Sequence, residues 1–281
     1  MKVRIVVDSV ADVKKEIAER LTVVPLNINY GDEQYVDGET MTKEQFYKKL
    51  ATSSVMHRTS QPSPAAFESV YEEAKKAGES LVVLTVSSKL SGTYQSAMIA
   101  AEDYPGQVFV VDTKTASIGA GILAELALRL ADSGMSAAEI ADRITEERDK
   151  VFVIAMLDTL EYVKRGGRIS KAVAFAGGLL SIKPVVSLKD GEIVILGKAR
   201  GSRQGNNLLV TEIGNAGGVD FDKPVLLGYT GLSDLLLQKY IEDSQPLWAN
   251  GTDSLRSTPI GSVIGTHAGP GAVAAAFFKK D

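Results

Sequence analysis

Leu81-Val82-Val83-Leu84-Thr85-Val86-Ser87-Ser88-Lys89-Leu90-Ser91-Gly92-Thr93 joins a short apolar, β-branched run to a turn that is rich in hydroxyl groups. The run has the length and composition of a strand that is buried on both faces. A helix is expected to start near Thr93. A buried strand that leads through a turn into a helix is the repeating unit of a parallel sheet covered by helices.

The same alternation extends over the first half of the chain. Helix starts are marked by capping boxes at Thr42 with Gln45 and at Ser136 with Glu139, and by Ser63 before Pro64. Ser9 is expected to cap the first helix. The expected strands are 3–7, 23–30, 81–86 and 108–111, and the expected helices are 11–21, 42–50, 63–77, 93 onward, 117–131 and 136–150. This half is predicted to form a mostly parallel α/β/α sheet domain.

The second half has a different pattern. Asp190-Gly191 is a strong two-residue turn signal between apolar runs at 185–188 and 193–196, so a hairpin is expected there. Further strands are expected at 151–157, 225–229 and 263–266, and helices at 158–165, 203–213, 234–241 and 272–278. We therefore predict a second α/β domain with a mixed sheet. The boundary is placed near Lys150, giving domains 1–150 and 151–281.

Composition limits the classes of function. The 281 residues include 44% hydrophobic and 23% charged residues, which is typical of a soluble globular protein, and the net charge of −4 argues against a nucleic-acid-binding body. The lack of cysteine excludes disulfides, thiolate nucleophiles and Cys-based zinc sites. No signal peptide and no membrane-spanning run of roughly 18 apolar residues is recognised, so a cytoplasmic location without stable membrane insertion is expected.

Three hydroxyl-rich turns, at 59–64, 87–93 and 265–271, stand where strands are expected to run into helices. Hydroxyl groups, exposed backbone N–H groups and a helix N-terminus together suit a small anion. The same residue types also make ordinary caps and turns. The third turn holds His267, one of only two histidines in the chain, which favours a shared anion site.

Individual residues in these turns have two interpretations each. Ser91 could donate its hydroxyl to an anion that the Gly92 N–H also contacts, or it could be an N-cap. Thr59 and Ser60 precede a stretch that Pro62 and Pro64 stiffen, which would help to aim a hydroxyl group at a ligand. Alternatively, they belong to a plain loop that caps a helix. His267 could pair with a carboxylate or lie on the surface, and His57 is interpreted as a bystander or rim residue.

Two basic clusters, 164–168 and 198–203, could meet a phosphate or an acidic partner, although such clusters are usually solvated faces. Nucleotide-binding loops and the common hydrolase and metalloprotease motifs are missing from the sequence. One enzymatic alternative stays open: a serine hydrolase or esterase acting on a lipid-like ester. Ser91 would be its nucleophile and His267 its base, with Asp8 or Asp112 orienting the base.

Five motifs in order resemble the DegV family over nearly the whole chain. They are Asp8-Ser9, Thr59-Ser60-Gln61-Pro62-Ser63-Pro64, Ser88-Lys89-Leu90-Ser91-Gly92-Thr93-Tyr94, Asp158-Thr159-Leu160-Glu161-Tyr162-Val163-Lys164-Arg165-Gly166-Gly167-Arg168-Ile169 and His267-Ala268-Gly269-Pro270-Gly271. The resemblance implies a two-domain DegV-like α/β fold that binds one long-chain fatty acid between its domains. It also implies no cofactor and no catalytic machinery in this chain, and a separate fatty-acid kinase as partner in phospholipid synthesis.

The resemblance also assigns roles to residues. Thr59 and Ser91 would hold the carboxylate of the fatty acid, with Ser60 and the Gly92 N–H close by, and His267 would complete the hydrogen-bond network. Arg200 matches a basic position implicated in docking or gating by the kinase. The segment Gly201-Ser202-Arg203 departs from the family pattern by adding a glycine and a second arginine, so either Arg200 or Arg203 could play that role.

Overall fold

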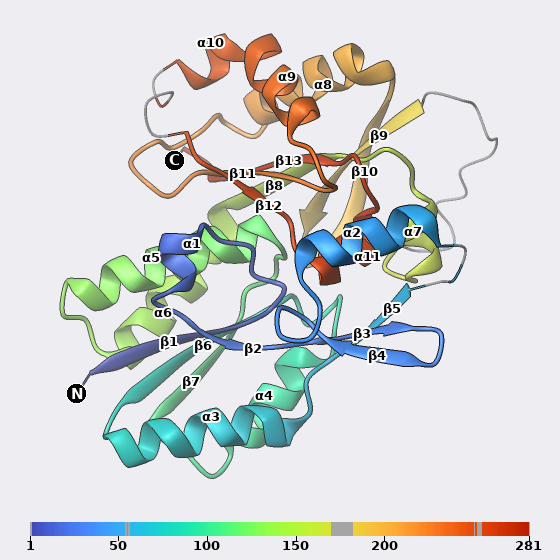
Figure 1. Ribbon diagram of the computed structural model, residues 1–281. Coiled ribbons are helices and arrows are strands. Elements are labelled where there is room, and N and C mark those ends of the chain that lie inside the picture. The colour runs from blue at the N-terminus through green and yellow to red at the C-terminus, as the bar shows by residue number, and fades with distance from the viewer. Residues whose placement is uncertain are drawn as a thin grey trace.

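The computed structural model describes residues 2–53, 55, 57–169, 182–249, 251 and 255–280 (Figure 1). The elements up to residue 150 are β1 (Val3–Asp8), α1 (Lys15–Ala18), β2 (Thr22–Val24), β3 (Asn27–Tyr30), β4 (Glu33–Val36), α2 (Lys43–Thr52), β5 (His57–Ser60), α3 (Pro64–Ala77), β6 (Ser80–Thr85), α4 (Thr93–Ala101), β7 (Val108–Asp112), α5 (Ile118–Asp132), α6 (Ala137–Glu147) and a 3₁₀ turn (Arg148–Lys150). The later elements are β8 (Val151–Met156), α7 (Glu161–Arg165), β9 (Ile182–Lys189), β10 (Glu192–Arg200), α8 (Gly201–Asn215), β11 (Leu226–Tyr229), α9 (Leu235–Asp243), α10 (Gln245–Trp248), β12 (Ser257–Pro259), α11 (Ser262–Ala268) and β13 (Val273–Phe278).

A four-stranded parallel sheet with the order β2-β1-β6-β7 confirms the architecture predicted for the first half. Side chains alternate across β6. Val82 and Leu84 pack in a core with α5 and α6, whereas Leu81 and Val83 pack in a core with α3 and α4. Helices therefore cover both faces, which explains why the strand is apolar at nearly every position.

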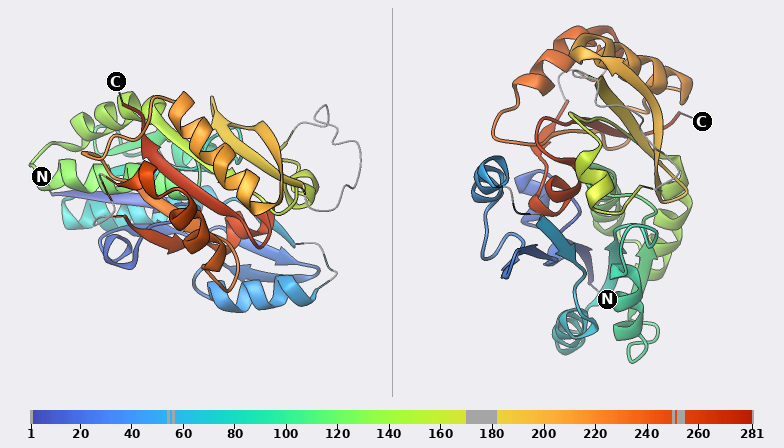
Figure 2. Two further views of the ribbon diagram at one scale, coloured as in Figure 1. Left: turned by 90° about the horizontal axis from the view of Figure 1, so that it is seen from above. Right: turned by 90° about the vertical axis from the view of Figure 1, so that its right-hand side faces the viewer.

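A small antiparallel sheet, β4-β3-β5, was not expected from the sequence. The strand predicted at 23–30 is two strands that belong to different sheets: β2 pairs with β1, and β3 pairs with β4 and β5. Figure 2 shows this small sheet and α2 together at one edge of the molecule. β5 carries Thr59, one of the predicted site residues.

The six-stranded sheet has the order β10-β9-β8-β13-β11-β12 and is mixed, as predicted. Its only parallel pair among the described strands is β11 with β12. The predicted hairpin is present and longer than expected, from Ile182 to Arg200. Asp190 and Gly191 both have positive φ, at 51° and 85°, as a tight hairpin turn requires.

Two predicted elements are wrong: a predicted strand is a helix in the structure, and a predicted helix is a strand. Residues 263–266 look like a strand because of β-branched Val263, Ile264 and Thr266, yet they lie in helix α11. Residues 272–278 look helical because of their alanines, yet β13 is a fully buried strand between β8 and β11. Tertiary packing overrides propensity here, since small alanine side chains let helices approach the middle of the sheet closely. The turn at 265–271 thus runs from helix to strand.

The first predicted helix is also wrong in length. α1 spans only Lys15–Ala18, and Ser9 does not cap it, because the Ser9 hydroxyl accepts a hydrogen bond from the Leu26 N–H at 3.0 Å. The other helix starts agree well with the sequence. Both capping boxes form, and the Ser63 hydroxyl accepts the Ala66 N–H as the cap of α3.

Helix α5 lies between the two large sheets, and a single hydrophobic core joins them around it. That core contains Ile5 and Leu84 from the parallel sheet and Ala274 and Ala276 from β13. Because the core continues across residue 150, the division into domains 1–150 and 151–281 stays a prediction. No helix in the described ranges is long and apolar enough to cross a membrane.

Candidate functional site

A largely apolar pocket lies between elements of the two halves of the chain. The space between its lining atoms, counted with the part that is open to solvent, is about 900 Å³. Its walls come from β8, β9, β10, α7 and α11 in the second half. In the first half they come from β5 and from the loops that follow β1, β2, β6 and β7. Apolar lining residues include Val86, Val153, Leu157, Val186, Leu188 and Ile193.

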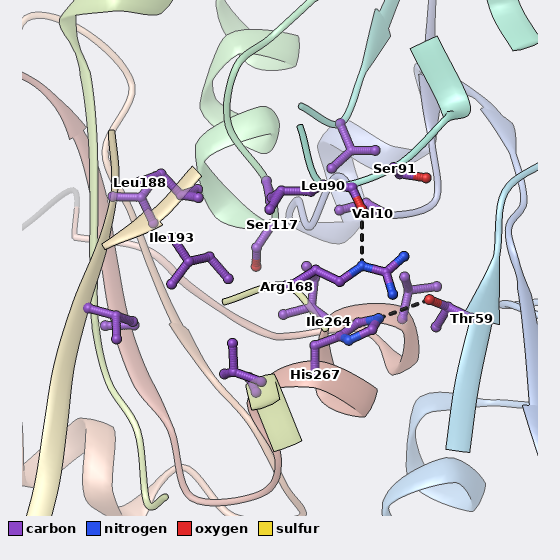
Figure 3. Close-up of a pocket in the computed structure, with 18 of the residues that line it drawn as sticks. Val10, Thr59, Leu90, Ser91, Ser117, Arg168, Leu188, Ile193, Ile264 and His267 are labelled. Carbon is purple, nitrogen blue, oxygen red and sulfur yellow. Dashed lines mark hydrogen bonds between the residues drawn. The ribbon is translucent and has the colours of Figure 1, made fainter. Parts of the chain in front are cut away.

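Polar side chains gather on one side of this pocket. Figure 3 shows Thr59, Ser91, Arg168 and His267 towards one side and Ile193 and Leu188 towards the other. Such an arrangement suits an amphipathic ligand with one polar end, because apolar walls cannot satisfy a polar group.

Thr59 and His267 are in direct contact. The Oγ1 atom of Thr59 lies 2.9 Å from Nε2 of His267, and either atom can donate, depending on the tautomer of the ring. Thr59 comes from β5, and His267 comes from the last turn of α11. Two of the predicted site residues, from opposite halves of the chain, are thus brought together.

The surroundings of His267 keep its ring neutral. Burial, and then the charge of Arg168, lowers the pKa of His267 to about 4. Its Nδ1 atom is buried and has no hydrogen-bond partner among the described residues. Gly166 packs so closely on the ring that a Cβ at that position would lie 2.1 Å from Nδ1. The ring can therefore exchange hydrogen bonds only through Nε2, on the side of Thr59.

Ser91 lines the same pocket, in the loop before α4. Its hydroxyl lies 2.9 Å from that of Thr93, and Gly92 occupies the N-cap position of α4. Ser91 thus lines the pocket from the position before the cap, and its hydroxyl also accepts the Thr93 N–H at 3.4 Å.

Ser60 and Gly92 are not among the residues that line the pocket. The Ser60 hydroxyl accepts a long hydrogen bond, 3.4 Å, from Nδ2 of Asn29. Gly92 packs against Gln61, where a Cβ would lie 2.1 Å from Oε1, and Gln61 in turn donates to Ser96. These two predicted site residues thus lie next to Thr59 and Ser91 in the chain and outside the pocket wall.

Arg168 is a pocket residue that sequence reasoning missed. The cluster 164–168 looked most like a solvated face, yet Arg168 lines the pocket and is only partly exposed. Its Nε donates to the Leu90 carbonyl oxygen at 3.1 Å, and its Nη1 donates to the Gly166 carbonyl oxygen at 2.6 Å. The guanidinium thereby links the Ser91 loop to the Gly166 turn. The available signal was the conformationally free Gly166-Gly167 pair directly before it.

The remaining predicted residues lie elsewhere. Arg200 is exposed at the end of β10, and Arg203 is exposed in the first turn of α8. Figure 1 shows α8 on the side of the six-stranded sheet away from α5. His57 is buried in β5 between the rings of Tyr30 and Phe46 and is not a rim residue.

The serine-hydrolase geometry is not assembled. Asp8 accepts the N–H groups of Val10 and Val86, and burial raises its pKa to about 7. Asp112 accepts the N–H groups of Ser88 and Lys114. Neither carboxylate reaches His267, whose Nε2 contacts Thr59 rather than Ser91. In the described part of the chain, no group of three or more acidic or histidine residues could hold a metal ion.

Comparison with known proteins gives one consistent answer. The model of a family described as "Uncharacterised protein, DegV family" matches residues 2–280. A DegV domain-containing protein of Caldanaerobacter subterraneus subsp. tengcongensis is 35% identical, and the match covers 99% of each chain.

Solved structures agree with the sequence comparison. A DegV family protein from Thermus thermophilus, described as fatty-acid binding, is 32% identical with a TM-score of 0.87 over 99% of this chain and 100% of that one. A fatty acid binding DegV family protein from Streptococcus agalactiae is 28% identical with a TM-score of 0.85 over the full length of both chains. Through its fold, its five motifs and these relatives, the chain belongs to the DegV family.

Proposed function

We propose that this protein binds one long-chain fatty acid in the pocket. The acyl chain lies along the apolar walls, and the carboxylate lies at Thr59, Ser91 and His267, with Arg168 beside them. The observation that carries this proposal is the grouping of these four residues on one side of a largely apolar pocket. The other two polar residues that line the pocket, Ser117 and Ser187, donate their hydroxyl groups to Asp12 and to the Val153 carbonyl oxygen. The fatty-acid binding described for the relative from Thermus thermophilus supports it.

The acyl chain is expected to supply the affinity. A saturated sixteen-carbon acid carries about fourteen methylenes, and each contributes about 0.8 kcal/mol when it is buried. The gross gain is therefore about 11 kcal/mol, and association costs at least about 4 kcal/mol of it. The difference corresponds to a dissociation constant near the micromolar range without help from the carboxylate.

The polar residues are expected to orient the carboxylate. A carboxylate that enters an apolar pocket without partners is strongly destabilised. Hydroxyl groups and a neutral imidazole can satisfy its oxygens, and Arg168 adds a positive charge nearby. The sequence alone suggested only neutral donors, and Arg168 changes that view. Because Arg168 donates two hydrogen bonds to backbone carbonyls, its guanidinium is held in place before a ligand arrives.

The second part of the proposal is presentation of this carboxylate to a separate fatty-acid kinase, in the cytoplasm, for phospholipid synthesis. The family resemblance supports this role, and the sequence contains no nucleotide-binding loop that could supply a phosphoryl group. In this role the protein is a carrier without a reaction of its own. Exposed Arg200 and Arg203 are the proposed docking residues for the kinase.

Native mass spectrometry of the purified protein, together with organic extraction, tests lipid binding. We expect one co-purified acyl chain per protein and saturable uptake of palmitate after delipidation. A protein that contains no acyl chain and takes up no palmitate would disprove the proposal. Ester hydrolysis together with labelling of Ser91 by a serine-reactive probe would favour the hydrolase instead.

Charge reversal tests the docking role. Arg200→Glu with Arg203→Glu should slow acyl-phosphate formation by the kinase and leave palmitate affinity unchanged. Reversal of two exposed lysines elsewhere, Lys15→Glu with Lys76→Glu, is the matched control for net charge. Equal effects from the two pairs would assign the loss to overall charge and not to docking.

A further inference from the structure

Asp12 is a buried carboxylate outside the pocket that touches two parts of the pocket wall. It follows β1, and only 3% of its surface is exposed. A buried carboxylate is stable only with good partners. The partners of Asp12 come from three different elements, so its environment is organised by the tertiary structure and not by its own loop.

The first partner is Ser117, which lines the pocket just before α5. Its hydroxyl donates to Oδ2 of Asp12 at 2.8 Å, and the Asp12 N–H donates to the Ser117 carbonyl oxygen at 3.2 Å. Ser117 has φ 55° and ψ −133°, a conformation that residues other than glycine rarely adopt. The two hydrogen bonds to Asp12 hold this strained residue against the space that an acyl chain would fill.

The second partner is the start of helix α11, which carries His267. The Gly261 N–H, at the N-cap of this helix, donates to Oδ1 of Asp12 at 2.6 Å. Lys43 lies 3.3 Å from the same oxygen and also donates to the Pro259 carbonyl oxygen at 2.7 Å. The chain that enters α11 is thereby fixed to the first half of the protein.

We propose that Asp12 is a positioning residue for His267. Oδ2 of Asp12 accepts a hydrogen bond from Ser117 in the pocket wall, and Oδ1 accepts one from the start of the helix that carries the imidazole. An acyl chain that contacts Ser117 therefore changes the position of His267 through Asp12. This inference rests on the proposed function, because it takes an acyl chain as the ligand.

The test uses a ligand without a carboxylate. It distinguishes an effect on His267 that passes through Ser117 and Asp12 from direct contact between a carboxylate and the His267 ring. Pentadecane fills apolar space and cannot hydrogen-bond to His267. The histidine ring signals are followed by NMR in labelled protein, before and after pentadecane, in the parent, Ser117→Ala, Asp12→Asn and Tyr47→Phe. Tyr47→Phe is the matched control. It removes another buried hydrogen bond to the same segment, from the Tyr47 hydroxyl to the Ile260 carbonyl oxygen at 3.0 Å, and leaves Asp12 intact.

We expect pentadecane to shift the His267 signals in the parent and in Tyr47→Phe. The shift should be lost in Ser117→Ala, although pentadecane still binds, and it should be lost or reduced in Asp12→Asn. An undiminished shift in Ser117→Ala would mean that the alkane acts on the ring directly, and this would overturn the proposal. Loss of the shift in Tyr47→Phe would also overturn the proposal. It would mean that the loss of any buried hydrogen bond to the segment before α11 abolishes the shift, whether or not Asp12 is involved. If Asp12→Asn does not fold, Ser117→Ala decides.

These outcomes are distinct from failure of the proposed function. A parent protein that binds neither palmitate nor pentadecane contradicts lipid binding itself, and with it the inference. A parent that binds both without any movement of the His267 signals upon pentadecane binding contradicts only the role of Asp12.

Discussion

Nε2 of His267 lies 2.9 Å from Oγ1 of Thr59, although 208 positions separate the two residues in the chain. The contact joins β5 of the small sheet to α11, which leads into β13, one of the two middle strands of the six-stranded sheet. It also leaves the two side chains at the polar side of an apolar pocket. A carboxylate that enters there can take hydrogen bonds from groups already oriented by each other.

Thr59→Val is predicted to weaken fatty-acid binding modestly. The change removes the hydroxyl and keeps the shape, so one hydrogen bond to the carboxylate is lost, worth about 1 kcal/mol or about fivefold in affinity. Isothermal titration with palmitate measures it. The control is Thr211→Val on α8, where the hydroxyl only bonds the Asn207 carbonyl oxygen. Equal affinities for the two variants would remove Thr59 from the site.

His267 should give the protein a characteristic loss of stability in acid. Its pKa is about 4 in the folded protein, lowered by burial and then by Arg168, against about 6.5 when unfolded. Between those values only the unfolded state takes up the proton, so the free energy of unfolding falls as pH drops from about 6.5 to 4. The total loss is up to about 3 kcal/mol. Denaturant unfolding at several pH values measures it.

His267→Gln is the comparison that isolates this effect. Asp8 and Asp37 have pKa values raised by burial to about 7 and about 6, so they act in the opposite direction. The stability they contribute is complete in acid and is lost as pH rises through those values. Both groups are present in parent and variant, so their slopes cancel in the difference. A difference that does not change between pH 6.5 and 4 would mean that His267 titrates normally.

The limits of sequence reasoning are clearest at residues 263–266 and 272–278. Local composition favours a strand in the first and a helix in the second, and the structure has the reverse. Long-range contacts decide both. Asp12 accepts a hydrogen bond from the Gly261 N–H at the start of α11. β13 pairs with a strand on each side, β8 and β11, in the middle of the sheet. Neither contact has a local signature, whereas runs such as 81–86 depend on burial alone and were predicted.

The site was predictable in part for a related reason. Thr59, Ser91 and His267 were singled out because hydroxyl groups and a scarce histidine are conspicuous, and the fold gathers them around one pocket. Arg168 was not predicted as a site residue, because an arginine in a basic cluster is most often exposed. What places it in the pocket is a pair of hydrogen bonds to the backbone, one of them to Leu90, 78 residues earlier. Only the folded chain reveals such bonds.

Gly166→Ala is predicted to displace the His267 ring. A Cβ would lie 2.1 Å from Nδ1, far inside contact distance, so the ring must move and its contact with Thr59 must lengthen. We expect a cost of about 1–3 kcal/mol in stability and weaker palmitate binding. Gly214→Ala is the control, because a Cβ there meets open space. Wild-type affinity and an unchanged His267 NMR signal in Gly166→Ala would contradict the packing described.

Arg168→Met is predicted to affect binding of an acid and to spare binding of its ester. The unbranched Met side chain keeps part of the apolar stem and removes the charge, so a carboxylate loses a favourable interaction of about 1.5–3 kcal/mol, or about tenfold or more in affinity. Methyl palmitate carries the same acyl chain without a charge, so its affinity should change little. The ratio of the two affinities, measured by competition with a fluorescent fatty acid, reports the charge alone. If both ligands weaken equally, the role of Arg168 is to hold the Leu90 and Gly166 backbone together, and the carboxylate depends on Thr59, Ser91 and His267 only.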